Sequence, residues 1–152
     1  IGYVLSRFHE AHRRELPELI ALADHVESVQ HGHPARPLGL TEVLRRIAVE
    51  LDLHMRKEEQ MLFPMMAAGG HPHIRNPISC MRRDHDHHRE TMILLDALVQ
   101  GGLVPEDACA HWRALAIGLR KMIDDLMDHI RYENEVLFAR FEADHTGARP
   151  TE

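Results

Sequence analysis

The chain has 152 residues, the size of one domain, which argues against a two-domain enzyme with a separate cofactor module. Hydrophobic residues make up 44% and charged residues 28%, which excludes a disordered chain. A net charge of −6 argues against nucleic acid as a partner, and no apolar run approaches the roughly 18 residues of a membrane span. The unusual count is 14 histidines, which indicates histidine chemistry in one domain.

Helix-forming residues with 3.6-residue spacing dominate the chain. The first predicted helix runs over about 2–31, and Pro17 is expected to kink it because proline removes a backbone donor. The second runs over about 40–68, with Pro64 disturbing its last turns and Gly69-Gly70 ending it.

The third and fourth helices are predicted over about 77–100 and 105–143. Asn76 is expected to cap the third helix, with Pro77 at its first helical position and Gly101-Gly102 after its end. Four long helices with short connections predict an all-α, up-down-up-down four-helix bundle that takes in all 152 residues as a single domain.

The two cysteines and the first residue indicate the cellular compartment in which the protein is expected. Cys80 and Cys109 open the third and fourth predicted helices, so their thiols should lie on the order of 20 Å apart. We therefore expect no disulfide, two small buried hydrophobes and a reducing compartment. Ile1 in place of Met indicates a processed chain or a fragment, and nothing near it resembles an export signal. A cytoplasmic location is expected.

Two motifs occur twice in the sequence. The first is a histidine followed four residues later by a glutamate and then by Leu-Phe, with copies over 54–63 and 129–138. The second is His-x-x-His-Arg, with copies over 9–13 and 85–89. The copies are 75 and 76 positions apart in the same order, which predicts two related helix hairpins with a pseudo-two-fold axis between them.

The spacing inside the first motif fixes which side chains share a helix face. Residues four apart differ by about 40° around the axis, so Glu58 points the same way as His54, and Glu133 the same way as His129. Glu59 is rotated by about 140° from His54, so it should face solvent or a neighbouring helix.

The remaining two helices contribute His9 and His85, each about two turns from its helix start, while the two glutamates lie about three turns before their helix ends. In an alternating bundle these ends share one side, so six side chains are predicted to meet in one layer: His9, His54, Glu58, His85, His129 and Glu133.

Such a donor set predicts two metal ions. Six ligands exceed the four of a structural zinc, and imidazole with carboxylate but no thiolate suits iron or manganese. The simplest arrangement gives each ion two histidines and bridges the ions through Glu58 and Glu133.

Other polar residues near this layer have open roles. His12 and His88 lie one turn from His9 and His85, respectively. They are alternative ligands to these two residues, hydrogen-bond donors to the ligands, or packing groups. Asp84, Asp86 and Asp128 are candidates to hold ligand imidazoles, and each is alternatively a solvated carboxylate.

Longer motifs surround these residues over nearly the whole chain. They are Phe8-His9-x-x-His12-Arg13, Leu16-Pro17-Glu18-Leu19-Ile20, His54-Met55-x-Lys57-Glu58-Glu59-Gln60-x-Leu62-Phe63-Pro64, Pro77-Ile78-x-x-Met81, Asp84-His85-Asp86, Pro105-Glu106-x-Ala108-Cys109-x-x-Trp112, and Asp124-Asp125-Leu126-Met127-x-His129-Ile130-x-x-Glu133-Asn134. At these residues the chain resembles the hemerythrin-like di-iron proteins, and more closely the repair-of-iron-centres family of bacterial stress proteins.

The resemblance implies a protein that helps to restore iron–sulfur clusters damaged by nitric oxide or oxidants. It places two non-haem iron ions, oxo- or hydroxo-bridged, on the same six residues, with Glu58 and Glu133 bridging. Damaged iron–sulfur proteins, nitric oxide and oxygen would be its partners. Iron donation and reduction of nitric oxide are both chemistries that the resemblance leaves open, as is the oligomeric state.

Three departures and two alternatives accompany this expectation, and one departure is Gln30, followed by His31, where relatives often have histidine after Val-x-x-Val. The family usually carries an N-terminal cysteine-containing module that these residues do not include, and Asp84 stands where glutamate is more usual. A reversible oxygen or nitric oxide binding protein or sensor is the main alternative. The other is a bundle in which zinc or nickel has only a structural role.

Overall fold

The computed structural model of the protein describes residues 1–99 and 104–143. Within these ranges the elements in chain order are α1 (Gly2–Val4), the π-helical segment η1 (Leu5–His9), α2 (Glu10–Val29), α3 (Leu40–Lys57), the π-helical η2 (Glu58–Leu62), α4 (Phe63–Ala67), α5 (Arg75–Leu98), α6 (Ala110–Tyr132), the π-helical η4 (Glu133–Leu137) and α7 (Phe138–Ala143). Because α1, η1 and α2 are continuous, as are α3 to α4 and α6 to α7, these segments form three long rods, and α5 is the fourth.

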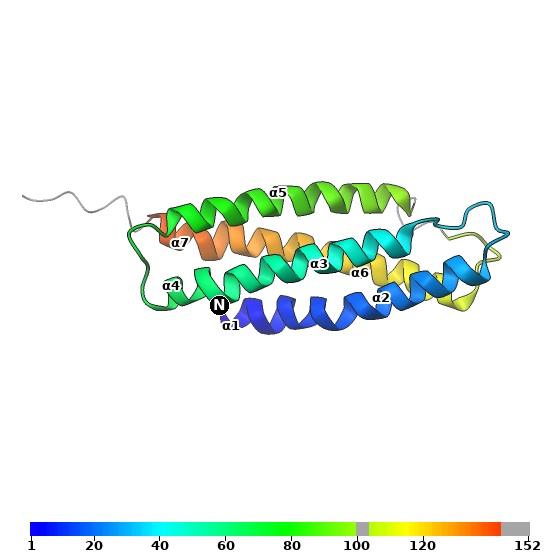
Figure 1. Cartoon of the computed structure of the whole chain (residues 1–152), viewed down its shortest axis with the longest axis horizontal. Helices are drawn as coiled ribbons and strands as arrows, with labels where there is room; N and C mark the ends of the chain where they lie inside the picture. Colours follow the sequence, from blue (N-terminus) through cyan, green and yellow to red (C-terminus); the bar gives the residue numbers. More distant parts are fainter. Residues whose placement is uncertain (100–103, 144–152) are drawn as a thin grey trace, which may run out of the picture.

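The four rods lie side by side along one axis, with the N-terminus, α4 and α7 at the same end (Figure 1). In this arrangement α2 packs against α3 and α6, and α5 packs against the same two helices. The predicted all-α, up-down-up-down four-helix bundle is therefore confirmed.

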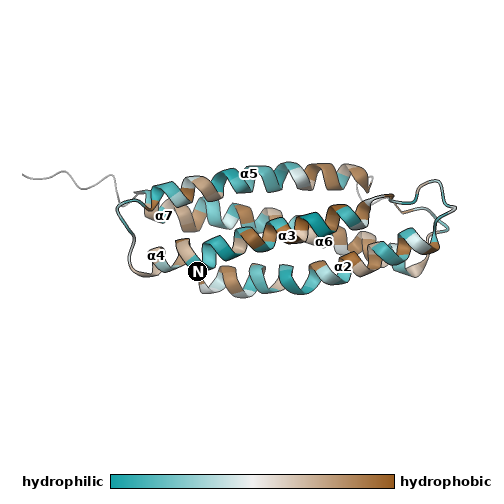
Figure 2. Ribbon diagram, in the orientation of Figure 1, coloured by the Kyte–Doolittle hydropathy of each residue, from teal (hydrophilic) through white to brown (hydrophobic). Residues whose placement is uncertain are grey.

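Two apolar clusters form the core. The larger one joins α2, α3, α6 and the C-terminal half of α5, and the smaller one joins α1, α4, α7 and the start of α5. Hydropathy colouring shows apolar stretches toward both ends of the bundle and hydrophilic stretches along the middle of α5 (Figure 2). Burying each apolar stripe stabilises the bundle, and the buried histidines and glutamates lie between the two clusters.

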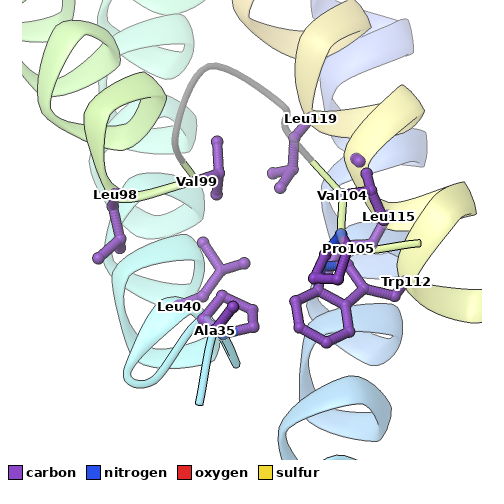
Figure 3. Close-up of a pocket in the computed structure, with 11 residues that line it drawn as sticks. Ala35, Leu40, Leu98, Val99, Val104, Pro105, Trp112, Leu115 and Leu119 are labelled. Atoms are coloured by element: carbon purple, nitrogen blue, oxygen red, sulfur yellow. The ribbon is translucent and has the colours of Figure 1, made fainter. Parts of the chain in front are cut away.

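A cavity of about 220 Å³ opens among the residues of the larger cluster. Leu40 and Trp112 stand on opposite walls of it (Figure 3). No side chain that lines it is ionisable, so it offers no group for acid–base chemistry or for metal ligation.

The start of the third rod differs from its prediction. Helix α5 begins at Arg75 with Ile74 as its N-cap, so Asn76 is not the cap and Pro77 is not the first helical residue. Pro77 is tolerated because the first-turn backbone N–H groups of a helix have no intrahelical partner. The helix ends at Leu98, and the predicted stop at Gly101-Gly102 lies outside the described residues.

The fourth rod begins five residues later than predicted. Pro105 opens a turn in which the Ala108 N–H donates to the Pro105 carbonyl at 3.0 Å. Cys109 then has an extended backbone and is the N-cap of α6, which starts at Ala110. The prediction was wrong here because proline is common both at the first position of a helix and in turns, and Pro105 begins a turn.

The first two rods agree more closely with the sequence. Helix α2 continues through Pro17 to Val29, two residues short of the predicted end. Gly69 and Gly70 have φ values of 89° and 106°, the left-handed region that favours glycine, and they follow the last turn of α4 as predicted.

Both cysteines are free, as predicted, but each is half-buried rather than buried. No helix in the described ranges 1–99 and 104–143 is long and apolar enough to cross a membrane.

Candidate metal centre

The three π-helical segments coincide with the repeated motifs. Segment η1 ends at His9, while η2 and η4 begin at Glu58 and Glu133. A π-helical turn inserts one extra residue and shifts the helix face after it, and such turns occur often at functional sites. In η2 and η4 the turn follows the glutamate, so the preceding His-x-x-x-Glu spacing keeps its α-helical register.

The six predicted ligand side chains all point into the bundle, and none is more than 2% exposed. Glu58 lies between two rods, because its Oε2 is 3.3 Å from His9 Nε2 and 3.5 Å from His54 Nε2. One carboxylate oxygen thus faces histidines from the first and the second rod.

Glu133 also lies between histidines of two rods, but each of its two carboxylate oxygens faces a different histidine. Its Oε1 is 3.1 Å from His129 Nε2, and its Oε2 is 3.1 Å from His85 Nε2. The two glutamates therefore connect histidines of all four rods.

The donor atoms form two groups of four in which all atoms lie within 4.8 Å of one another. One group contains His9 and His129, the other contains His54 and His85, and both contain Glu58 and Glu133. This is the arrangement predicted from spacing: two positions, each with two imidazoles, that share two carboxylates.

Several of these buried atoms have no hydrogen-bond partner in the described part of the chain. They are His9 Nε2, both ring nitrogens of His129, and both carboxylate oxygens of Glu58 and of Glu133. Buried polar atoms without partners are costly. A cation between them would satisfy lone pairs and carboxylate charge together, so the donor set fits a metal ion.

The electrostatics of the centre lead to the same conclusion. Burial and the adjacent Glu133 carboxylate raise the pKa of Glu58 well above its ordinary value. Burial alone would also raise the pKa of Glu133, but the imidazoles of His129 and His85 outweigh it and lower that pKa. Burial and the neighbouring His85 lower the pKa of His54 to about 3, so its ring is neutral and offers a lone pair.

Glu59 orients one of the histidines from behind. His9 Nδ1 donates to Glu59 Oε1 at 2.7 Å, and Arg13 holds the same carboxylate with hydrogen bonds of 2.7 and 3.1 Å. A carboxylate on Nδ1–H fixes the tautomer that leaves Nε2 free for a metal. Glu59 thus faces a neighbouring helix, one of the two positions expected for it.

Two further histidines have partners at Nδ1. His85 Nδ1 donates to Asn134 Oδ1 at 2.9 Å. His54 Nδ1 lies 3.5 Å from Asp84 Oδ2, which also accepts a 2.8 Å hydrogen bond from Lys57. Asp84 was a predicted partner, whereas Asn134 was missed. The repeat could have identified Asn134, because it follows Glu133 as Glu59 follows Glu58.

Phenylalanine rings pack against the histidines. Phe63 stacks on His9 with ring centroids 5.8 Å apart, and Phe138 stacks on His85 at 5.6 Å. These two pairs are equivalent in the repeat. The flat faces of the imidazoles are therefore covered by apolar rings, which limits their rotation and excludes water.

The other residues with open roles are also placed. His12 and His88 are buried beside the centre but belong to neither four-residue group. Asp86 pairs with Arg89 and Asp128 with Arg131, so neither holds an imidazole.

Comparisons with known proteins agree with this geometry. The family model described as the hemerythrin HHE cation binding domain matches residues 1–141. The chain is 44% identical over 140 residues to the iron-sulfur cluster repair protein YtfE of Dickeya chrysanthemi, covering 92% of this chain and 63% of that protein. It is 41% identical to the probable iron-sulfur cluster repair protein of Haemophilus influenzae over the same shares.

The iron-sulfur cluster repair protein YtfE of Escherichia coli O139:H28 is 43% identical to this chain, which covers 64% of its length. The chain thus spans less than two thirds of the length of these relatives. The matched family model takes in all four rods and all six side chains of the centre. The chain belongs to the hemerythrin family, as a cation-binding HHE domain.

Proposed function

We propose that the chain binds two iron ions and serves in the repair of iron–sulfur clusters damaged by nitrosative or oxidative stress. The observation that supports this is the pair of four-residue groups that share Glu58 and Glu133. Relatives that match 140 residues at 41–44% identity carry the name of iron–sulfur cluster repair proteins.

The donor chemistry favours iron. In each group two imidazoles and two carboxylates face one position, and no thiolate is among them. This set suits a non-haem iron ion, which prefers six ligands and so keeps coordination positions for other molecules. We assign His9 and His129 to one ion, His54 and His85 to the other, and both glutamates to the bridge.

Each side chain has a distinct task in this proposal. When bound, iron would supply both a transferable ion for cluster rebuilding and a redox-active centre for nitric oxide. The imidazoles hold the ions through Nε2, and Glu59, Asn134 and Asp84 keep those nitrogens aimed inward. Damaged iron–sulfur proteins are the proposed recipients.

Restoration of activity tests the proposal directly. A cluster-dependent dehydratase is inactivated with nitric oxide and then incubated with the iron-loaded chain. We expect recovery with the wild-type chain and with Asp128→Ala, because Asp128 pairs only with the exposed Arg131. His129→Ala removes a buried donor and should restore little activity. Equal recovery with His129→Ala would contradict the proposal.

Elemental analysis after native purification separates this proposal from a structural metal site. About two irons per chain are expected, whereas a single zinc would contradict iron donation. If the chain binds oxygen reversibly but restores no dehydratase activity, the result would instead support the function of an oxygen carrier or sensor.

A further inference from the structure

A cleft of about 730 Å³ lies between α3–η2 and α5. His54, a proposed iron ligand, and His88 form part of its wall, as do Glu50 and His87 nearer the surface. The cleft therefore connects the protein surface with the His54 side of the centre.

His88 is a buried group that the centre itself does not use. Its side chain is 6% exposed, and its ring centroid lies 5.0 Å from that of His54. Its Nε2 is buried and has no hydrogen-bond partner in the described residues. A buried imidazole nitrogen without a hydrogen-bond partner is a potential metal ligand.

The mouth of the cleft carries a second pair of donors. His87 is exposed, and its Nε2 lies 3.7 Å from Glu50 Oε2. Glu50 and His87, then His88, then His54 form a series of imidazole and carboxylate groups from the surface to the centre. Each of these side chains can ligate a divalent transition-metal ion.

The internal repeat provides a direct comparison. By the repeat, the contact between α5 and α3 corresponds to the contact between α2 and α6, and His88 corresponds to His12. His12 is 2% exposed, lies beside His129 with ring centroids 5.4 Å apart, and has an unpartnered Nε2 in the described residues. The two histidines are thus alike in burial and in distance to a proposed ligand.

The surfaces above them differ. Between α6 and the first rod, Asp125 accepts hydrogen bonds of 2.7 Å from both Arg7 and Lys121, and Lys121 also binds Glu15 at 2.7 Å. These ion pairs bridge the two rods on the side of His12.

The equivalent positions on the other side carry only part of this bridge. Glu50 corresponds to Asp125, Arg46 to Lys121 and Arg83 to Arg7, but Thr91 stands where Glu15 would be. Glu50 faces His87 instead, at the cleft of about 730 Å³ that reaches His54 and His88. A smaller pocket of about 190 Å³ lies at the equivalent place between the first rod and α6–η4, with Phe8 where the cleft has Asp84, and neither His12 nor His129 lines it. The two sides of the pseudo-two-fold repeat therefore differ at the surface above the proposed centre.

We propose that the two ions of the centre differ in their access to solvent. The ion held by His54 and His85 enters and leaves through the α3–α5 cleft, with His88 Nε2 as a transient ligand. The ion held by His9 and His129 is enclosed. In this transfer the coordination bond to His88 Nε2 would form as the bond to His54 Nε2 breaks, and the bonds to His85, Glu58 and Glu133 would break before the ion leaves. No proton or electron is exchanged. The inference rests on the proposed two-ion centre and identifies which ion is available for donation.

Iron release measures this directly. The chain is loaded with Fe²⁺ without oxygen, an excess of a coloured ferrous chelator is added, and release is followed by absorbance. We expect two phases of equal amplitude. His88→Leu, which keeps the volume and removes the nitrogen, should slow the faster phase by about tenfold or more while the bound iron stays unchanged. His12→Leu is the matched control and should leave the faster phase as in the wild type.

A second variant tests the mouth without altering the core. Glu50→Gln combined with His87→Ala changes only partly exposed side chains and should also slow the faster phase. Release in one phase, or equal effects of His88→Leu and His12→Leu, would overturn the route. Loss of one iron on purification of His88→Leu would also overturn it, by making His88 a permanent ligand. A wild-type chain that never holds two irons would instead refute the proposed centre.

Discussion

Glu59 and Asn134 occupy equivalent positions in the two halves of the chain, and each accepts the Nδ1 hydrogen bond of a histidine from a different rod. The distances are 2.7 Å from His9 to Glu59 and 2.9 Å from His85 to Asn134. Each acceptor directly follows one of the shared glutamates at the start of a π-helical segment. The same turn thus supplies a carboxylate of the proposed metal centre and the group that orients a histidine.

We expect Glu59→Ala to weaken metal binding although Glu59 touches no metal position. Without the carboxylate, the His9 ring loses the partner that fixes its tautomer and orientation. Loss of such a partner lowers metal affinity by about 10- to 100-fold. Competition against a chelator of known iron affinity measures this change.

Asp86→Ala is the control for this variant, because Asp86 also neighbours a proposed ligand but pairs only with Arg89. Its affinity should equal that of the wild type. If both variants bind iron equally well, the hydrogen bond to His9 does not contribute.

Removing one histidine and removing one glutamate should have different effects on stoichiometry. His54 belongs to one four-residue group, whereas Glu58 belongs to both. We therefore expect His54→Ala to retain about one ion per chain and Glu58→Ala to retain close to none. Elemental analysis of the purified variants measures the ratio. Equal iron contents in the two variants would contradict the shared carboxylate.

The sequence predicts the six side chains of the centre because their positions depend only on helical periodicity and on a repeat. His54 and Glu58 share a face at i and i+4, and the copy at His129 and Glu133 fixes the partner rod. The structure brings together all six. Helix boundaries were less accurate, because Pro105 begins a turn and not the helix that follows it.

Contacts between rods could not be predicted from spacing within one rod. Glu59 points away from His54 on its own helix, and only the position of the first rod shows that it reaches His9. The absence of a partner for His129 Nδ1 within the described residues has a similar origin. Phe8 stands where the repeat has Asp84, and it stacks on His129 with ring centroids 4.8 Å apart.

Replacing a shared glutamate should have opposite effects on the metal-free and the metal-loaded protein. Glu58 is fully buried beside Glu133, so its carboxylate is costly when no cation is present. We expect Glu58→Gln to raise the free energy of unfolding of the chelator-treated chain by about 1–3 kcal/mol. With iron present the variant should be the less stable protein, because an amide is a weaker ligand. Urea unfolding with chelator and with Fe²⁺ measures both.

Glu133→Gln provides the contrast. Its carboxylate lies 3.1 Å from both His129 Nε2 and His85 Nε2, and these imidazoles favour the charged form. The metal-free chain should therefore gain no stability from this substitution. A gain as large as that of Glu58→Gln would show that the two carboxylates have the same environment.

Acid should weaken the bridge between the first rod and α6. Burial alone would raise the pKa of Asp125, but the hydrogen bonds from Arg7 and Lys121 outweigh it and hold that pKa below its ordinary value. A carboxyl whose pKa is lower in the folded than in the unfolded state stabilises the fold above the unfolded pKa of about 4. This stabilisation is lost as the pH falls through the folded pKa.

Comparing the wild type with Asp125→Asn isolates this contribution, because other acid-sensitive groups cancel. Between about pH 5 and 7 the wild type should exceed the variant by about 1–3 kcal/mol in free energy of unfolding, the range for hydrogen bonds to charged groups. The difference should shrink below about pH 4 as the carboxyl is protonated. Urea unfolding of the chelator-treated proteins across this range measures it. A difference that stays constant down to pH 2 would mean that Asp125 contributes by packing, since only the loss of its charge makes the bridge sensitive to acid.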